Sequence, residues 1–311
     1  MRPKLLISRG GKSLTPYMAW FSTAWERSGG DCKLDVGLPR KVRALFGRMG
    51  LTFTTGVRCG QLLVCGGHRV ESVAWPWCYF YEIVPVMWDV WPECFEPLVK
   101  FIKKNKVRLV FCTSSQQVKH LEERVTGLKA VWLPEGIDVD SYPMGERLAE
   151  RPTDILEYGR RMATVHDDLV AYSWGSPVKH AYHDGPGLLF PDFDSMTAGI
   201  RNAKITICYP QCDTKPWRAG TVETVTQRYW EGMLSGTLIA GRAPQELIDL
   251  CGYNPVITLG DNPARQIEDI LSRIDDYQDL ADRNRKYAVE NADWSKRIPI
   301  VKKALELEEN G

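Results

Sequence analysis

The sequence predicts an α/β protein with two doubly wound domains, each built on a parallel sheet. Apolar strand-like segments alternate with segments of helical periodicity, as in sheets covered by helices. The alternation occurs in two blocks separated by the polar stretch GERLAERPT (145–153). A chain of 311 residues also exceeds the size at which one core usually keeps growing. We therefore expect two domains with a cleft between them.

The first block contains four strand-like segments. They are KLLISRGG (4–11), QLLVCGG (61–67), VRLVFCTSS (107–115) and KAVWLPEGIDVDSYP (129–143). Their apolar runs followed by small residues are typical of strands buried on both faces. Asp89 in MWDVWP follows another apolar run, so it is expected at the carboxyl end of a strand, where open α/β sheets bind ligands.

Four tryptophans surround Asp89: Trp75, Trp77, Trp88 and Trp91. Their rings could form a platform for sugars or bases, because an aromatic ring offers a flat apolar face. In so apolar a stretch, however, large aromatic side chains usually fill a core. We expect most of the four to be buried.

The second block continues the alternation. Its strand-like segments are DILEYGRR (154–161), DLVAYSWGS (168–176), GLLFP (187–191), AKITICYP (203–210), GTLIAG (236–241) and PVITLG (255–260). Residues 264–292 have a helical pattern. The predicted domains are 1–148 and 149–290, followed by a terminal helix at 291–311 that crosses back to the first domain.

The composition excludes several classes of protein. Hydrophobic residues make up 44% and charged residues 25%, as in ordinary globular proteins. The nine cysteines never form a Cys-x-x-Cys pair, which argues against a zinc ribbon and a disulfide framework and favours the cytoplasm. The aromatic stretch 73–95 is interrupted by acidic residues and prolines, so it is not expected to span a membrane. Peripheral contact with a membrane surface stays open.

The positive charge is concentrated near the N-terminus. Residues 1–60 contain eleven Lys/Arg and three Asp/Glu, a net charge of +8, although the whole chain has a net charge of +1. This asymmetry favours an anionic partner: a phosphorylated substrate, an anionic membrane surface or nucleic acid. A solvated basic face is an equally good explanation.

The sequence does not contain a complete P-loop, metal-binding or serine-hydrolase motif. RGGKS ends like a phosphate-binding P-loop, but Leu6 stands where that motif needs its first glycine. Gly10 and Gly11 could still bring backbone amides close to a diphosphate. HAYHDGPG groups His180, His183 and Asp184 without a further ligand cluster, so no metal site is expected there. No Gly-x-Ser-x-Gly elbow is present.

The stretch ETVTQRYWEGMLSG (223–236) carries two glutamates eight positions apart. On one continuous helix, Glu223 and Glu231 would share a face and could be plain surface carboxylates. The β-branched TVETVT is a poor helix interior, so we expect the helix to start around Thr226, with Glu223 in the loop and Glu231 in the early helix. Both carboxylates would then face the helix N-terminus, which attracts diphosphates.

These residues resemble glycosyltransferases of the GT-B fold, most of all the retaining family 4, also called glycosyltransferases group 1. Glu223, seven residues, Glu231 and then Gly236 match the two-glutamate motif of that family. Further similar segments are WLPEGIDVDSYP (132–143), DILEYGRR (154–161), FDSMTAGIRNAKITICYP (193–210), APQELIDLCGYNPVITL (243–259) and ADWSKRIPIVKKAL (292–305). The resemblance implies two Rossmann-like domains and covers most of residues 100–311.

The resemblance also implies roles for individual residues. Glu223 would contact hydroxyls of the donor sugar, and Glu231 the ribose of the nucleotide. Gly159 and Arg160 form the Gly-Arg element whose cation would neutralise the diphosphate, with Gly10 and Gly11 donating amides from the other domain. Thr226 would mark the diphosphate-binding helix start.

Arg228, within the same motif, is a further candidate for the phosphates, with a surface arginine as its alternative. Two features depart from the family. The usual lysine after Gly-Arg is absent, so that Arg161 or Lys215 would have to replace it, and the usual glycine between the glutamates is missing.

The sequence thus predicts a hexosyl- or pentosyltransferase that moves a sugar from a nucleoside diphosphate sugar to a saccharide, lipid-linked or other hydroxyl acceptor. Retention of configuration and independence of metals or other cofactors follow from the resemblance, and Asp89 is a candidate on the acceptor side. Two alternatives stay open: glycosylation of modified bases in phage-type DNA, and an inactive protein that binds nucleotide sugars or carbohydrates.

Overall fold

The computed structural model describes residues 2–7, 17–35, 41–42, 45, 59–67, 70–185 and 187–309. The chain divides into two compact units. Unit 1 comprises Met1–Pro134, Arg218–Val222 and Trp294–Gly311, and unit 2 comprises Glu135–Trp217 and Glu223–Asp293. The limits 1–148, 149–290 and 291–311 stay sequence-based predictions.

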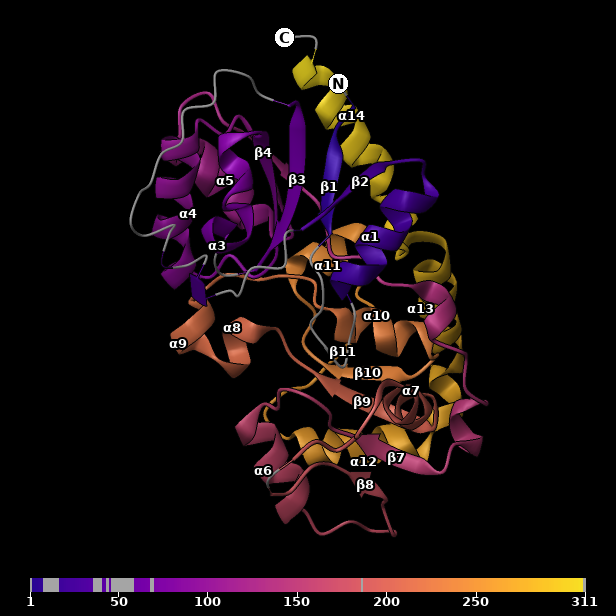
Figure 1. Ribbon diagram of the computed structural model, residues 1–311. Coiled ribbons are helices and arrows are strands. Elements are labelled where there is room, and N and C mark those ends of the chain that lie inside the picture. The colour runs from indigo at the N-terminus through magenta and orange to yellow at the C-terminus, as the bar shows by residue number, and fades with distance from the viewer. Residues whose placement is uncertain are drawn as a thin grey trace. The chain divides into compact units, whose positions relative to one another are not determined.

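Unit 1 contains a six-stranded parallel sheet in the order β2-β1-β3-β4-β5-β6 (Figure 1). The strands are β1 (Lys4–Ile7), β2 (Asp31–Leu34), β3 (Gln61–Gly66), β4 (Glu82–Met87), β5 (Leu109–Cys112) and β6 (Lys129–Trp132). Helices α1 (Tyr17–Arg27), α3 (Val70–Ala74), α4 (Pro92–Asn105), α5 (Ser115–Arg124) and α14 (Ile298–Glu309) accompany the sheet. The strand order reverses between β1 and β3.

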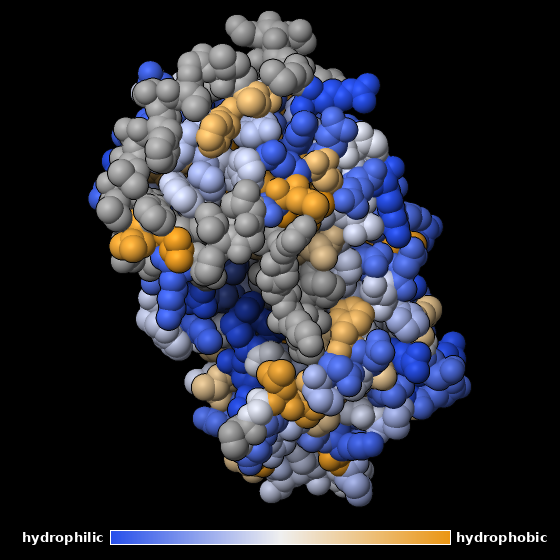
Figure 2. All heavy atoms as spheres, viewed as in Figure 1, coloured by the Kyte–Doolittle hydropathy of each residue, from blue (hydrophilic) through white to orange (hydrophobic). Residues whose placement is uncertain are grey.

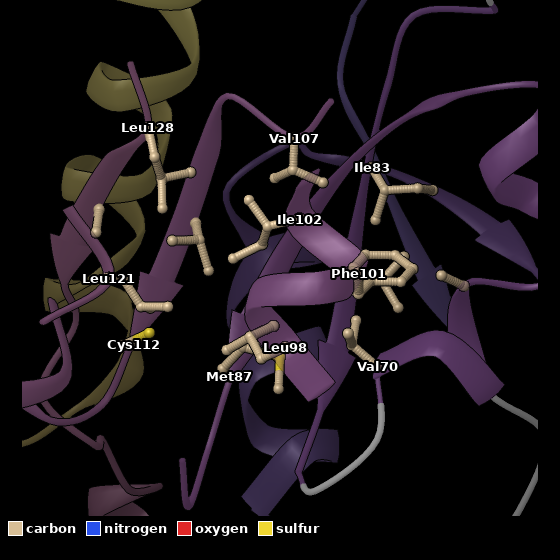
Figure 3. Packing of buried hydrophobic residues seen from close by; sticks show 14 of the residues in the cluster. Val70, Ile83, Met87, Leu98, Phe101, Ile102, Val107, Cys112, Leu121 and Leu128 are labelled. Atoms are coloured by element: carbon tan, nitrogen blue, oxygen red, sulfur yellow. The ribbon is translucent and has the colours of Figure 1, made fainter. Parts of the chain in front are cut away.

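Successive residues of the strands in unit 1 serve two hydrophobic cores. Leu62 and Val64 of β3 belong to one core and Leu63 to the other, because alternate side chains of a strand point to opposite faces. The first core includes side chains of α3, α4 and α5, such as Val70, Leu98 and Leu121, shown in Figure 3. The second includes side chains of α1 and α14.

Unit 2 contains a five-stranded parallel sheet in the order β11-β10-β9-β7-β8. The strands are β7 (Thr153–Leu156), β8 (His180–Ala181), β9 (Ala203–Cys208), β10 (Leu238–Gly241) and β11 (Ile257–Thr258). The helices are α6 (Ala163–Ala171), α7 (Phe193–Arg201), α8 (Gln211–Thr214), α9 (Pro216–Ala219, which runs into unit 1), α10 (Gln227–Leu234), α11 (Gln245–Cys251), α12 (Pro263–Ser272) and α13 (Gln278–Asn291). Two parallel sheets, each with helices, confirm the predicted α/β fold class.

Two predicted strands of the second block are wrong. The segment 168–176 begins inside α6, where Val165 and Leu169 are buried four residues apart, as on one face of a helix. The segment 187–191 contains no strand, and its Leu188 is 68% exposed. The structure instead forms the short strand β8 at His180–Ala181, which pairs with Ile155 and Leu156 of β7.

The described surface that faces the viewer in Figure 2 is mainly hydrophilic, with its hydrophobic residues in small separate groups. Within the described ranges, none of the helices combines the length and the apolar character that crossing a membrane requires.

Candidate functional site

The strand order of unit 2 reverses between β7 and β9, with β8 on one side and β10 and β11 on the other. In open α/β sheets, ligands bind beyond the carboxyl ends of the strands at such a reversal. The loop after β7 carries Gly159 and Arg160, and the loop after β9 begins with Tyr209. A ligand site is therefore expected at this end of the sheet.

Arg228 of α10 connects these two loops. Its Nη1 donates to the carbonyl oxygen of Arg160 at 2.7 Å, and its Nη2 to that of Tyr209 at 3.1 Å. Gly159 has a φ of 72°, and a Cβ at this position would lie 3.4 Å from the Cδ of Arg228. The structure thus brings together three residues that the sequence singled out. Contact of Arg228 with a phosphate stays a prediction.

Helix α10 begins at Gln227, with Thr226 extended at the N-cap position (φ −94°, ψ 157°), which confirms the predicted helix start. The hydroxyl of Thr226 does not cap the helix. Its Oγ1 and the Nε2 atoms of Gln227 and Gln211 are buried without a hydrogen-bond partner among the described residues. Leaving a buried donor unpaired is costly, so these groups suit an acceptor-rich ligand such as a phosphate.

Glu223 lies in the loop before α10, as predicted. Its Oε1 accepts a hydrogen bond from Nη1 of Arg242, and its Oε2 accepts one from the backbone N–H of Gln245, at 3.0 Å. Gln245 is the first residue of α11, so the positive end of that helix dipole also favours the carboxylate. The side chain of Glu223 is 19% exposed.

Arg242 also binds Asp213 through two hydrogen bonds, Nε to Oδ2 at 2.5 Å and Nη2 to Oδ1 at 2.8 Å. The hydrogen bonds with Asp213 are the main cause that raises the pKa of Arg242, with a further contribution from Glu223 against the effect of burial. A planar guanidinium held by two carboxylates fixes the orientation of both. Arg242 and Asp213 were not predicted, although both lie just outside the motif 223–236 along the chain.

Glu231 lies in the second turn of α10 and is 3% exposed. Its Oε1 accepts a hydrogen bond from the Tyr142 hydroxyl at 3.0 Å and its Oε2 one from the Tyr158 hydroxyl at 2.9 Å. Burial raises the pKa of Glu231, while the two tyrosines and the positive charge of Arg228 lower it. Both tyrosines were missed, although Tyr158 immediately precedes Gly159.

The remaining predicted residues fall in unit 1 or outside the described residues. Asp89 follows β4 as expected, is exposed and has a φ of 53°, a conformation that Asp tolerates better than most residues. Gly10 and Gly11 lie outside the described residues. So do six of the eleven basic residues of the N-terminal region: Arg9, Lys12, Arg40, Arg43, Arg48 and Arg58.

Trp88 and Trp91 are buried, 3% and 0% exposed, which confirms the expected core position for these two tryptophans. Trp75 and Trp77 are half-buried. The Nε1 of Trp77 donates to Asp35 at 3.0 Å, and Lys33 lies over its ring.

His180 has different neighbours from those the sequence indicated. In unit 2 it lies with Glu157 and His166, and the ligand atoms of the three side chains are within 4.8 Å of one another. Neither His183 nor Asp184 belongs to this group. The sequence could not show the grouping, because the three residues come from the exit of β7, from α6 and from β8.

No protein-family model and no curated protein sequence matches this chain. Several solved structures are similar to this chain. The Anabaena protein Alr3699/HepE in complex with UDP-glucose is 11% identical over 98% of this chain and 99% of its own, with a TM-score of 0.63. Sucrose-phosphate synthase from Thermosynechococcus elongatus is 10% identical over 100% of both chains, with a TM-score of 0.64.

AviGT4, a glycosyltransferase involved in avilamycin A biosynthesis, is 13% identical over 100% of this chain and 98% of its own, with a TM-score of 0.55. At these identities the likeness concerns the fold. The chain therefore has the fold of these GT-B glycosyltransferases, with two Rossmann-like parallel sheets, as the sequence resemblance implied.

Proposed function

We propose that the protein is a glycosyltransferase that moves a hexosyl or pentosyl group from a nucleoside diphosphate sugar to an acceptor hydroxyl, with retention of configuration and without a metal ion on the diphosphate. One observation carries the proposal. At the strand-order reversal of unit 2, Arg228 of α10 binds the carbonyl oxygen of Arg160, next to Gly159. The start of α10 carries unpaired donors, Glu223 lies in the loop before this helix, and Glu231 lies within it. This donor set fits a diphosphate flanked by sugars.

The cationic and amide groups at the carboxyl end of the sheet in unit 2 would stabilise the leaving group. As the bond between sugar and phosphate breaks, negative charge grows on the departing nucleoside diphosphate. Arg160, the Thr226 hydroxyl and the amides at the N-terminus of α10 are the groups that stabilise such charge. In the retaining GT-B mechanism the departing phosphate itself takes the proton of the acceptor hydroxyl. No enzymic nucleophile and no metal ion are then required.

Glu223 and Glu231 would bind the two sugar rings of the donor. An ionised carboxylate accepts several hydrogen bonds, so Glu223, already oriented by Arg242 and the N-terminus of α11, can also accept from hydroxyls of the transferred sugar. Glu231 is assigned to the ribose. Its two tyrosine partners, Tyr142 and Tyr158, would hold its carboxylate in a single orientation.

UDP is the first nucleotide to test, since the similar Anabaena structures contain UDP, UDP-glucose or UDP with glucose. Unit 1 would select the acceptor, a saccharide, a lipid-linked group or another hydroxyl compound, with Asp89 as its acceptor-side residue. The basic residues near the N-terminus would bind an anionic acceptor or membrane surface at the cytoplasmic side.

The test is a panel of UDP-, GDP-, ADP- and TDP-sugars, each incubated with the full chain, with and without simple saccharide acceptors. Release of nucleoside diphosphate is measured. Glu223→Ala and Arg160→Ala should each lower turnover about 100-fold or more, as expected when a contact made in the transition state is lost. Glu290→Ala, an exposed carboxylate on α13, is the matched control and should keep full turnover.

Wild-type turnover in both site variants would refute the site assignment. Binding of a nucleotide sugar without any turnover would instead support the alternative of an inactive binding protein. Transfer to duplex DNA with a steep salt dependence would favour a nucleic-acid acceptor.

A further inference from the structure

Three polar side chains of unit 2 converge beside β7, next to the Gly159–Arg160 turn. Glu157 directly follows β7, His166 is the fourth residue of α6, and His180 opens β8, the neighbouring strand. The Nδ1 of His166 lies 2.5 Å and the Nε2 of His180 lies 3.0 Å from the same carboxylate oxygen, Oε2 of Glu157. The backbone secures this arrangement, since Glu157 N–H donates to Ala181 C=O at 2.9 Å.

The second oxygen of Glu157 has no hydrogen-bond partner among the described residues. Glu157 is 2% exposed, and its Oε1 is buried. An unsatisfied oxygen on a buried carboxylate is costly, and the two imidazoles, which both contact Oε2, leave Oε1 unsatisfied. A cation bound between the carboxylate and the two rings would satisfy both oxygens.

We propose that Glu157, His166 and His180 form a binding site for a transition-metal ion of the Zn²⁺ type. Two imidazoles and one carboxylate are an established donor set for zinc, and Oε1 lets the carboxylate of Glu157 chelate the ion. Donors from different side chains around such an ion lie about 3.4 Å apart, given metal bonds of about 2.1 Å. The present distances of 2.5 and 3.0 Å to Oε2 therefore require only small outward movements of the two rings.

Arg161 opposes metal binding at this site. Its Nη1 lies 3.0 Å from Nε2 of His166, and a guanidinium only donates, so Nε2 accepts and the His166 proton is on Nδ1, facing Glu157. Metal bound at Nδ1 moves that proton to Nε2, where it meets the donor of Arg161. The guanidinium must then leave His166, and the nearby Tyr182 ring, 5.9 Å from its carbon Cζ, offers an alternative contact.

The test uses the full chain, treated with a chelator, transferred to chelator-free buffer and titrated with Co²⁺ and then with Zn²⁺. We expect one equivalent of Co²⁺ with the visible absorption of a four-coordinate site, displaced by Zn²⁺, and a higher Tm with either ion. Glu157→Gln, His166→Gln and His180→Gln should each weaken binding about tenfold or more. His183→Gln is the matched control, because His183 lies outside the group, and should bind as the wild type does.

Arg161→Gln makes the test specific to the proposed geometry. The glutamine carbonyl oxygen can accept the Nε2 proton of a metal-bound His166, and the substitution removes a positive charge. We therefore expect binding about tenfold tighter than in the wild type. A circular dichroism melt checks that each variant is folded.

Three results would overturn the proposal. They are the absence of stoichiometric Co²⁺ binding, binding that persists in folded His166→Gln and His180→Gln variants, and a sulfur-to-cobalt charge-transfer band, which would place the ion on cysteines. Since the readouts are metal binding and Tm, they are independent of any glycosyltransferase activity.

Discussion

At the scale of single residues, the two motif glutamates have different environments. Glu223 is partly exposed, and its carboxylate is held by a guanidinium and a helix N-terminus. Glu231 is buried and bound by two neutral hydroxyls. A carboxylate oriented by charge near solvent suits contact with a substrate. A buried carboxylate with a raised pKa makes stability depend on pH.

Glu231 provides a prediction about pH. Its folded-state pKa is raised above its ordinary value of 4.5, mainly by burial, so the folded state binds more protons than the unfolded state between these two values. Its contribution to stability is fully present below about pH 4.5 and is lost as the pH rises through the folded-state pKa. In the variant Glu231→Gln this side chain does not ionise, so its contribution to stability does not fall with rising pH. The difference in unfolding free energy, variant minus wild type, should therefore rise from pH 4 to pH 8, by about 1.4 kcal/mol for each unit by which the pKa is raised.

Urea unfolding of both proteins across this pH range measures the difference, because the other titrating groups largely cancel. Glu290→Gln, which replaces an exposed glutamate of the same unit, is the matched control. A flat or falling curve for Glu231→Gln would mean that burial does not dominate its pKa.

At the scale of elements, one arginine connects several segments of unit 2. The buried guanidinium of Arg151 donates to the carbonyl oxygens of Glu146 at 2.7 Å, Ala203 at 3.0 Å and Ser235 at 3.1 Å, and to Thr237 Oγ1 at 3.0 Å. It thereby joins the segment before β7, the start of β9 and the end of α10. Burial lowers the pKa of Arg151 to about 10, so it stays charged at neutral pH.

Arg151→Lys should destabilise the protein by about 2 to 4 kcal/mol, because an ammonium group has fewer donors than a guanidinium and cannot reproduce its planar fork. Chemical denaturation at neutral pH measures the loss. The matched control is Arg147→Lys, since Arg147 is 61% exposed and pairs with the exposed Asp275 at 3.5 Å. It should cost less than about 1 kcal/mol. Equal effects of the two substitutions would contradict a structural role for Arg151.

The elements that the sequence predicted well are those with a strong local signal. Apolar runs located β1, β3, β5, β7, β9 and β10, and the β-branched stretch before Thr226 placed the start of α10. The short strands β2 and β8 carry little such signal. The consecutive apolar residues of 168–176 predict a strand, whereas the burial of Val165 and Leu169 follows the helical period.

In the candidate site, too, residues with a local sequence signal could be predicted and residues without one could not. Glu223, Glu231, Gly159 and Arg160 could be selected from motifs that are local in sequence. Their partners could not, because Arg242 and Tyr142 reach the glutamates only through tertiary structure. The grouping of Glu157 with His166 and His180 likewise depends on the pairing of β7 with β8, and the sequence alone does not specify that pairing.

At the scale of the whole molecule, the proposed donor residues and the proposed acceptor residue belong to different units. Glu223, Glu231 and Arg160 are in unit 2, and Asp89 is in unit 1. If residues of unit 2 alone bind the nucleotide sugar, loss of the Asp89 carboxylate should leave donor binding intact and reduce transfer of the sugar. Binding and transfer can therefore be separated by one substitution.

Asp89→Asn is the appropriate variant, because asparagine also tolerates the left-handed backbone observed at this position (φ 53°). It removes the charge without imposing strain. UDP should slow amide hydrogen exchange in residues 157–161 and 223–231 equally in wild type and variant. Transfer to the acceptor should fall about tenfold or more in the variant, because a hydrogen bond between the acceptor and a charged carboxylate is lost. Asp89→Ala, which tolerates this backbone less well, is the control for strain and should also lower Tm. Loss of UDP protection in Asp89→Asn would show that this carboxylate supports donor binding and would refute the proposed division between the units.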